Sequence, residues 1–258
     1  MALPKGFVEA VRFAEERLRS LGTNLDGAKT FQPGQAQAIG LLMGLRSRSL
    51  FDATHYALRG PSDAAVRLIV RGMADLAILT AWLRLSPELH SELWEAEFAR
   101  QQLELTGALQ IQRVNRPDLD PLVIDQVAQQ AQQAVVATAR QRGLHAGVPG
   151  VSAKPNGKLM PNISERVDQV NTLVVREAYD LLVGWLSEWV HSGKGSFDDP
   201  SQVGAIDRQP DPNDYMLRSI AAVCHAVTLS EVSKWLGLGI ESECDALRAG
   251  LTTRWPMT

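Results

Sequence analysis

The chain has 258 residues, of which 45% are hydrophobic and 21% are charged, and its formal net charge is -3. This composition is that of a globular protein, and it excludes the disordered and fibrous classes. The charge balance lacks the excess of lysine and arginine that nucleic-acid binding proteins usually show, so DNA is not an expected partner.

Only two cysteines are present, Cys224 and Cys244, and their spacing matches neither a zinc site nor a disulfide scaffold. We therefore expect a protein of the reducing cytoplasm. The first 21 residues are amphipathic and carry charges throughout, unlike a signal peptide. Because no later apolar run reaches the length of a membrane span, the sequence predicts no contact with a membrane.

Apolar residues recur with the helical period along the chain, and no alternating pattern or hairpin turn indicates a strand. A first helix is expected over residues 4–21, followed by a loop to Pro33, so that residues 1–32 form a peripheral segment. Three long helices are predicted over residues 33–59, 63–85 and 87–114. Their boundaries are set by Gly60-Pro61, by Pro87 and by the Asn115-Arg116-Pro117 break.

In the second half, a helix with Pro121 in its first turn ends at Gly143, and its glutamines suggest a solvated face. Residues 143–163 and 193–213 are predicted to be irregular loops. Between them Ser164-x-x-Asp leads into a helix over 170–191, and further helices are expected over 214–236 and from Glu241. The pattern predicts one all-α domain over residues 1–258, a helical bundle of about seven or eight helices with two long irregular loops.

Charged residues on the predicted helix 63–85 form the first candidate site. Arg67, Arg71 and Asp75 stand at i, i+4 and i+8 among apolar residues, so one face of this helix must bury or half-bury charge. Arg71 and Asp75 can bond each other at this spacing. We expect the pair to be at least partly buried, with a further partner on another helix, because an unpaired charge there is costly. A structural ion pair is the simpler interpretation, and a catalytic role is the alternative.

A second polar set, Ser187, Glu188 and His191, lies at the end of the predicted helix 170–191, with Asp180 further back on nearly the same face. Ser187 and His191 are i, i+4 neighbours and can hydrogen bond. No Gly-x-Ser-x-Gly elbow accompanies them, which argues against a hydrolase triad, and a cap of the helix end by His191 is the simpler interpretation. The catalytic candidates of the sequence are thus Arg71, Asp75, Ser187 and His191.

A carboxylate followed three residues later by histidine occurs twice, as Asp52 to His55 and as Glu188 to His191. This spacing is found in the di-metal sites of helical bundles, where further glutamates complete the ligand set. About 0.6 such pairs are expected by chance in a chain of this composition. The sequence therefore predicts no metal and no cofactor, and these four residues are metal candidates only under the alternative of a di-metal enzyme.

Arginine followed by four to six residues and histidine is the signature of the helical ribonuclease superfamily called HEPN, whose arginine and histidine act on a scissile phosphate. Four segments match this spacing: Arg48 to His55, Arg84 to His90, Arg140 to His145 and Arg218 to His225. About one match is expected by chance, so four is an excess of which at most one could be functional. The polar residue that commonly follows the arginine in that family is replaced here by Ser49, Leu85, Gln141 and Ser219.

Two helical segments carry a further combination of motifs. The segment AAVRLIVRGMADLAILTAWLRLSP contains Arg71-x-x-x-Asp75, and the later segment LLVGWLSEWVHSG contains Ser187-x-x-x-His191-Ser192-Gly193. Over residues 40–200 this combination resembles an uncharacterised bacterial all-helical family, known as a domain of unknown function. Asp75 stands where that family usually has glutamate, and Val183 where it often has an aromatic residue. The resemblance implies a helical fold and a polar cluster between the Arg71–Asp75 helix and the His191 helix, and it implies no activity.

These patterns favour a helical interaction or ligand-sensing module, in a bacterial defence or stress setting, whose partner is a protein or a small molecule. The alternative is a HEPN-like ribonuclease that needs no metal and acts on RNA, a hypothesis that fold-level analogy with small phage-defence proteins favours slightly. A di-metal carboxylate enzyme is the third hypothesis. A homodimer, in which the partner is a second copy of the chain, is a further hypothesis.

Overall fold

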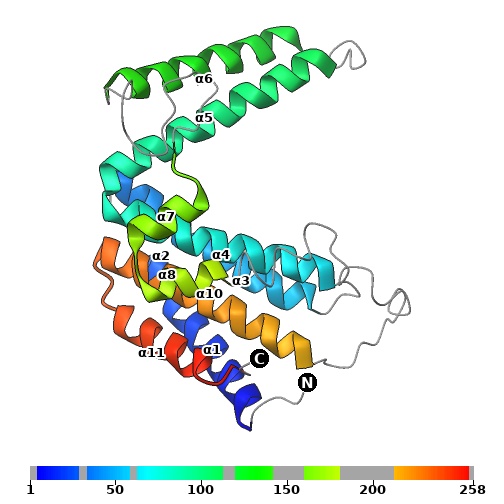
Figure 1. Cartoon of the computed structure of the whole chain (residues 1–258), viewed down its shortest axis with the longest axis vertical. Coiled ribbons are helices and arrows are strands. Elements are labelled where there is room, and N and C mark those ends of the chain that lie inside the picture. The colour runs from blue at the N-terminus through cyan, green and yellow to red at the C-terminus, as the bar shows by residue number, and fades with distance from the viewer. Residues whose placement is uncertain are drawn as a thin grey trace. The chain divides into compact units, whose positions relative to one another are not determined.

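The computed structural model describes residues 5–28, 34–58, 63–112, 120–141, 160–180 and 212–255 (Figure 1). Over these ranges the chain forms helices and turns and no strand, which confirms the predicted all-α fold. None of the helices in these ranges is both long and apolar enough to cross a membrane. The chain divides into two compact units, unit 1 (Met1–Leu85 and Val167–Thr258) and unit 2 (Ser86–Arg166). The single domain expected from the sequence stays a prediction.

Unit 1 contains most of the helices. They are α1 (Phe7–Gly22), α2 (Asn24–Ala28), α3 (Gln35–Ala57), α4 (Asp63–Leu85), the end of α7 (Ile163–Val170), α8 (Leu173–Asp180), α10 (Pro212–Leu236) and α11 (Glu241–Thr252). The long helices lie where the apolar period and the glycine and proline boundaries predict them, to within a few residues. The short helix α2 falls in the expected loop before Pro33. The expected irregular loops lie largely outside the described residues.

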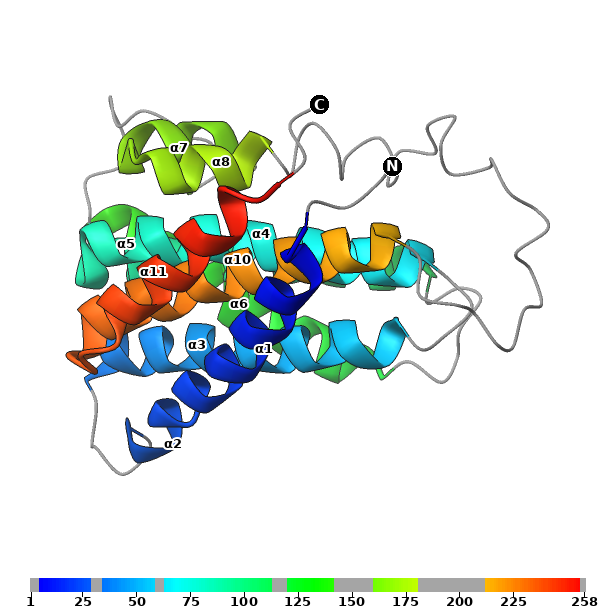
Figure 2. The same ribbon diagram turned by 90° about the horizontal axis from the view of Figure 1, so that it is seen from below.

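The helix α10 is the centre of unit 1. Every residue from Ser219 to Ser230 is buried, as expected for a helix that is apolar on all sides. It packs against α1, α3, α4 and α11, and Figure 2 shows α1 and α11 lying across it. The side chains that reach α10 from its neighbours therefore determine how unit 1 is assembled.

The helices α3 and α10 run antiparallel and approach each other closely. A Cβ atom added at Gly40 would lie 2.9 Å from the ring of Trp235, and one added at Gly44 would lie 3.3 Å from Cγ1 of Val232. Further along, Ser47 contacts His225. The residue numbers on α10 decrease as those on α3 increase, so the two helices run in opposite directions. The two glycines of α3 permit the close packing.

The helix α1, expected in a peripheral segment, contributes to the core. Its side chains at Phe7, Val11, Ala14, Leu18 and Leu21 are at most 4% exposed, and they recur at helical spacing along one stripe. This stripe packs against α10 and α11. A charged residue, Glu15, lies on the same buried side of the helix.

The sequence predicts that Ser164 and the following turns lead into one helix over 170–191. Over the described range 160–180, the chain instead forms two short helices, α7 and α8. The first, α7, starts with a capping box. The backbone N–H of Asn162 donates to Oε2 of Glu165, and the backbone N–H of Glu165 donates to Oδ1 of Asn162. Asn171 then takes a left-handed conformation, with φ of 48°, which ends α7. Asparagine tolerates this conformation better than most residues, which explains why the helix can end here. The break at Asn171 was not predicted from the sequence.

Unit 2 contains α5 (Pro87–Gln112) and α6 (Pro121–Gln141), which lie side by side (Figure 1). The connection between them is short, so they run antiparallel as a helical hairpin. Among the described side chains of α6, the buried apolar ones are Ile124 and Ala131, seven residues apart on one narrow stripe. Over its described side chains, residues 121–133, α6 therefore buries little of its surface.

Two glycine substitutions test the close contact of α3 and α10. Gly40→Ala is expected to lower the free energy of unfolding by roughly 1–3 kcal/mol, because the added methyl group overlaps the Trp235 ring. Gly72→Ala, on an exposed position of α4 with open space at the Cβ position, is expected to raise it by up to about 1 kcal/mol through helix propensity. Urea denaturation measures both. Equal stabilisation by the two alanines would contradict the packing described here.

Candidate functional site

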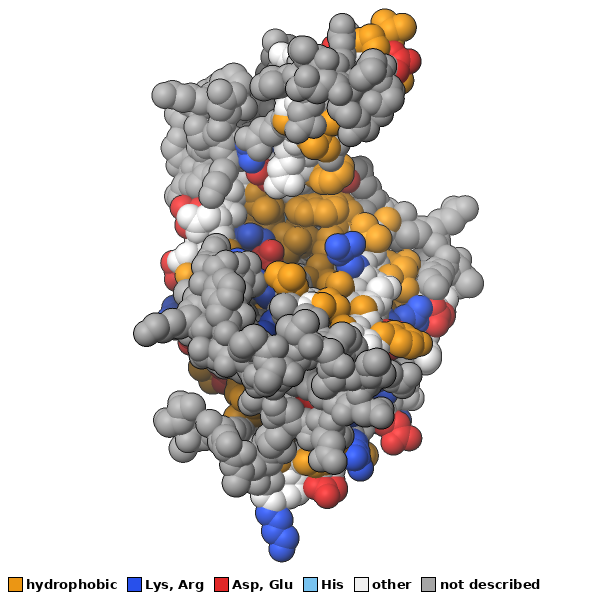
Figure 3. All heavy atoms as spheres, turned by 90° about the vertical axis from the view of Figure 1, so that its right-hand side faces the viewer, with side chains coloured by type: hydrophobic (Ala, Val, Ile, Leu, Met, Phe, Trp, Pro, Cys, Tyr) orange, Lys and Arg blue, Asp and Glu red, His pale blue; other side chains and the backbone are white. Residues whose placement is uncertain are grey.

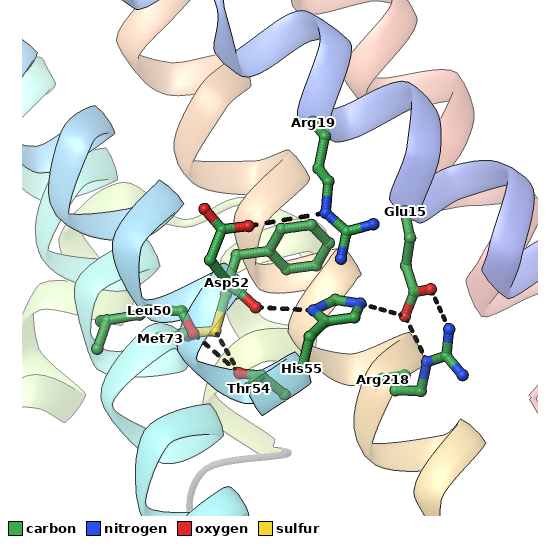
Figure 4. A network of polar contacts seen from close by, with 9 residues as sticks. Glu15, Arg19, Leu50, Asp52, Thr54, His55, Met73 and Arg218 are labelled. Atoms are coloured by element: carbon green, nitrogen blue, oxygen red, sulfur yellow. Dashed lines mark hydrogen bonds and ion pairs between the residues drawn. The ribbon is translucent and has the colours of Figure 1, made fainter. Parts of the chain in front are cut away.

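A carboxylate, Glu15, is buried where α1, α3 and α10 meet, with only 2% of the residue exposed. Arg218 of α10 holds it at two points: Nε donates to Oε1 at 2.7 Å, and Nη2 donates to Oε2. From α3, the Nε2 atom of His55 lies 3.0 Å from Oε1 of the same carboxylate (Figure 4). These three residues, the polar cluster, link three helices that are far apart in the sequence.

The electrostatics of the polar cluster favour an ionised carboxylate. Burial alone would raise the pKa of Glu15, but the hydrogen bonds and positive charges of His55 and Arg218 outweigh it, so the pKa lies below its ordinary value. In return, the contact with Glu15 raises the pKa of Arg218. The bidentate geometry is the strong form of an arginine–carboxylate pair. Glu15 and Arg218 are therefore both charged at neutral pH.

Both ring nitrogens of His55 are engaged inside the protein. Nδ1 donates to the backbone carbonyl oxygen of Phe51 at 2.9 Å, while Nε2 faces Glu15. The Phe51 ring meets the imidazole edge to face, with ring centroids 5.0 Å apart. This arrangement turns both nitrogens of His55 toward groups of the protein.

At the edge of the polar cluster, Arg19 and Asp52 form an exposed ion pair with an Nε to Oδ1 distance of 3.6 Å. The Asp52 carboxylate thus faces Arg19, whereas His55 faces Glu15 (Figure 4). Asp52 and His55 were predicted as a metal pair only under the di-metal hypothesis. Within the described ranges, no three His, Cys, Asp or Glu side chains are grouped to hold a metal ion. The other two candidates, Glu188 and His191, lie outside the described residues.

A second histidine, His225, lies two turns from Arg218 on α10 and is completely buried. Its Nδ1 atom is 2.8 Å from the Ser47 hydroxyl oxygen, and its ring stacks on Phe51 with centroids 4.7 Å apart. Burial, together with the positive charges of Arg48 and Arg19, lowers the pKa of His225 to about 3. His225 is therefore neutral at physiological pH and belongs to the core.

Two of the four arginine-to-histidine spacings meet in this region, because α3 carries Arg48 and His55 while the antiparallel α10 carries Arg218 and His225. The arginines have partners within the protein. Arg48 donates to Asp26 at 3.0 and 3.2 Å and to the Gly22 carbonyl oxygen at 3.2 Å, and Arg218 holds Glu15. With His225 buried and both nitrogens of His55 engaged, these two matches have a structural explanation.

The other two spacings give no further support to a ribonuclease site. Arg84 is paired with Glu231 of α10, and its matching histidine, His90, belongs to unit 2. The side chain of Arg140 and the whole of His145 lie outside the described residues.

The catalytic candidates on α4 are placed differently from the prediction. Arg71 is half-buried, but Asp75 is exposed, so the expectation that the pair is at least partly buried is wrong for Asp75. Leu68, Gly72 and Asp75 share one exposed stripe of α4, opposite the core stripe, and the buried arginine of this helix is Arg67, at 4% exposure. Ser187 and His191 lie outside the described residues, so the cluster implied by the family resemblance stays a prediction.

The sequence analysis missed the residue at the centre of the polar cluster. Glu15 stands four residues after Val11 and eight after Phe7, on the apolar stripe of its helix. A carboxylate at such a position needs a cationic partner, and this signal was present in the sequence. Which arginine and which histidine would approach it depended on the packing of distant helices.

A shallow groove of about 520 Å³ lies between α1 and α11. Apolar side chains line it, including Ala10, Phe13 and Leu251, and Lys5, Glu9 and Arg254 add charges of both signs. The mixture of charges selects no particular ligand.

Comparisons with known proteins provide no relative from which a role could be transferred. No family model matches the chain, and no curated protein and no solved structure matches it either.

A substitution at Glu15 tests whether the polar cluster stabilises the fold. Glu15→Ala leaves Arg218 and His55 largely buried without their counterion, so we expect the free energy of unfolding to fall by roughly 3 kcal/mol or more. Asp52→Ala, which removes an exposed carboxylate one contact away, should cost less than about 1 kcal/mol. Urea denaturation compares the two variants, and a loss of similar size in both would contradict the structural role of Glu15.

The burial of neutral His225 predicts a dependence of stability on pH. Its pKa is about 3 in the folded chain against an ordinary value of 6.5, so between these values the unfolded chain binds more protons. Stability should therefore fall as the pH falls through this window, by up to about 1.4 kcal/mol per pH unit from this group.

The slope of unfolding free energy between pH 6.5 and 5, above the range in which Glu15 titrates, measures this contribution. His225→Asn keeps a polar atom near Ser47 but cannot titrate, so its slope should be shallower than that of the original chain. Identical slopes would show that His225 is not held neutral by burial.

Proposed function

We propose that the chain is a helical interaction module that binds its partner through the α5–α6 hairpin of unit 2. The observation that carries this proposal is a set of exposed apolar side chains on both helices of the hairpin. Phe98 and Leu105 on α5 are 56% and 52% exposed, and Val123 and Val127 on α6 are 56% and 37% exposed. Hydrophobic side chains of this unit are visible at the surface in Figure 3.

These four residues lie on one side of the hairpin. Phe98, Leu105 and Val123 each directly precede a buried residue, namely Ala99, Thr106 and Ile124. Successive residues of an α-helix lie about 100° apart around its axis. Each of these three side chains therefore points about 100° away from the buried residue that follows it, and the direction of rotation along the chain is the same on both helices. In an antiparallel pair of helices, the same sense of rotation brings both sets to the same side. Val127 follows Val123 at i+4, and we call Phe98, Leu105, Val123 and Val127 the hairpin face.

The hairpin face has the properties of a docking surface. Its residues recur at i, i+7 on α5 and at i, i+4 on α6, which is the spacing by which helices bind in grooves and bundles. Full burial of one such side chain against a partner contributes about 1.5–3 kcal/mol relative to exposure. Exposed apolar residues that share one side of a helix pair are typical of interaction sites.

The polar cluster of unit 1 supports this division of roles. Arg218 and His55 both face the Glu15 carboxylate, an arrangement that links three helices of unit 1. The ribonuclease and di-metal hypotheses therefore gain no support from the described residues. The groove between α1 and α11 is a weaker candidate for a ligand-sensing role, because its charges oppose one another.

Site-specific photocrosslinking in the cells that produce the protein tests the proposal. A benzoylphenylalanine at Leu105 should give a crosslinked adduct of discrete mass, because a partner covers the hairpin face. The same residue at Leu68, which is 55% exposed on α4 of unit 1, serves as a matched control and should give none. Absence of a discrete adduct from position 105, or equal adducts from both positions, would refute the role of the hairpin.

A further inference from the structure

We infer that the partner of the hairpin face is a second copy of this chain, which places its own hairpin against the first. The inference rests on the proposed function and names the occupant of the docking surface. The outer hairpin, residues 101–112 and 121–141, carries Leu105, Val123 and Val127 of the hairpin face. It contains three charged residues, Glu104, Asp125 and Arg140, against 21% charged residues in the whole chain, whereas the segment around Phe98 also carries Glu95, Glu97 and Arg100. Two copies can therefore approach without the repulsion that like-charged surfaces suffer.

The polar residues of the hairpin are self-complementary. Gln126, Gln129, Gln130, Gln132 and Gln133 of α6 are all exposed, and Gln130 directly precedes the buried Ala131, next to the hairpin face. A glutamine amide both donates and accepts hydrogen bonds, so it can pair with an identical amide. A surface of glutamine and aliphatic side chains thus needs no partner of opposite charge, and it fits a copy of itself.

The size of the surface is sufficient for a dimer. The helix α6 has 21 residues, so it is about 30 Å long, and two helices side by side are about 20 Å wide. One side of the hairpin therefore measures about 600 Å². Two copies that met over its whole length would bury about 1,200 Å² in total, the lower bound for a stable interface.

Symmetry favours this arrangement. A twofold axis brings the same surface of two copies together, and this is the commonest form of protein oligomer. Two antiparallel hairpins joined in this way form a four-helix bundle, in which apolar stripes of the kind seen at the hairpin face line the core. Each hairpin would then cover the exposed Val123 and Val127 of the other copy.

Sedimentation of the purified full chain at concentrations up to about 100 µM tests the inference. We expect a concentration-dependent species of about 56 kDa, twice the 28.2 kDa of one chain. Leu105→Glu on α5 and Val127→Glu on α6 should each raise the dimer dissociation constant by at least about tenfold. Leu68→Glu, the same chemical change at matched exposure on α4, should leave it unchanged. Circular dichroism checks that each variant keeps its helices, as expected for exposed positions.

A chain that stays monomeric at this concentration, or a dimer that both hairpin variants leave intact, would overturn the inference. The crosslinking experiment separates this failure from that of the proposed function. An adduct at position 105 with the mass of two chains supports both statements. An adduct of another mass supports the interaction module and refutes the second copy as its partner.

Discussion

The burial of one carboxylate is the constraint on which the assembly of unit 1 depends. Glu15 lies on the apolar stripe of α1, where an ionised group without partners would be costly. Arg218 and His55 must therefore reach it, and this requirement fixes α10 and α3 relative to α1. The antiparallel contacts from Ser47 to His225 and from Gly40 to Trp235 are consistent with that alignment.

The same constraint accounts for the positions of the described arginines and histidines of α3 and α10 that match the ribonuclease spacing. Arginines and histidines of α3 and α10 are used to neutralise Glu15, to bind Asp26 and to fill the core. Neutral His225 and charged Arg48 coexist because the ring is removed from water while the guanidinium reaches the acidic side chain of α2. Under the proposed function, unit 1 is the scaffold and the hairpin face of unit 2 is the docking surface.

The helices were predictable because their apolar period and their boundaries, such as Pro87 and Pro121, are local properties of the sequence. The burial of Asp75 was predicted wrongly because apolar residues occur around the whole circumference of α4. The sequence therefore does not show which side of that helix faces the core, and packing decides it. The polar cluster was not predictable in full, since Glu15 and Arg218 are 203 residues apart. The glutamines of α6 were interpreted as a solvated face, and only the position of the buried stripe shows that exposed valines lie beside them.

Hydrogen–deuterium exchange at several protein concentrations tests the division between scaffold and docking surface most directly. If the hairpin face is covered by a second copy, backbone amides of α5 and α6 should exchange more slowly as the concentration rises. The amides of α10, buried within one chain, should exchange slowly at every concentration. Exchange in α5 and α6 that is independent of concentration would contradict the account.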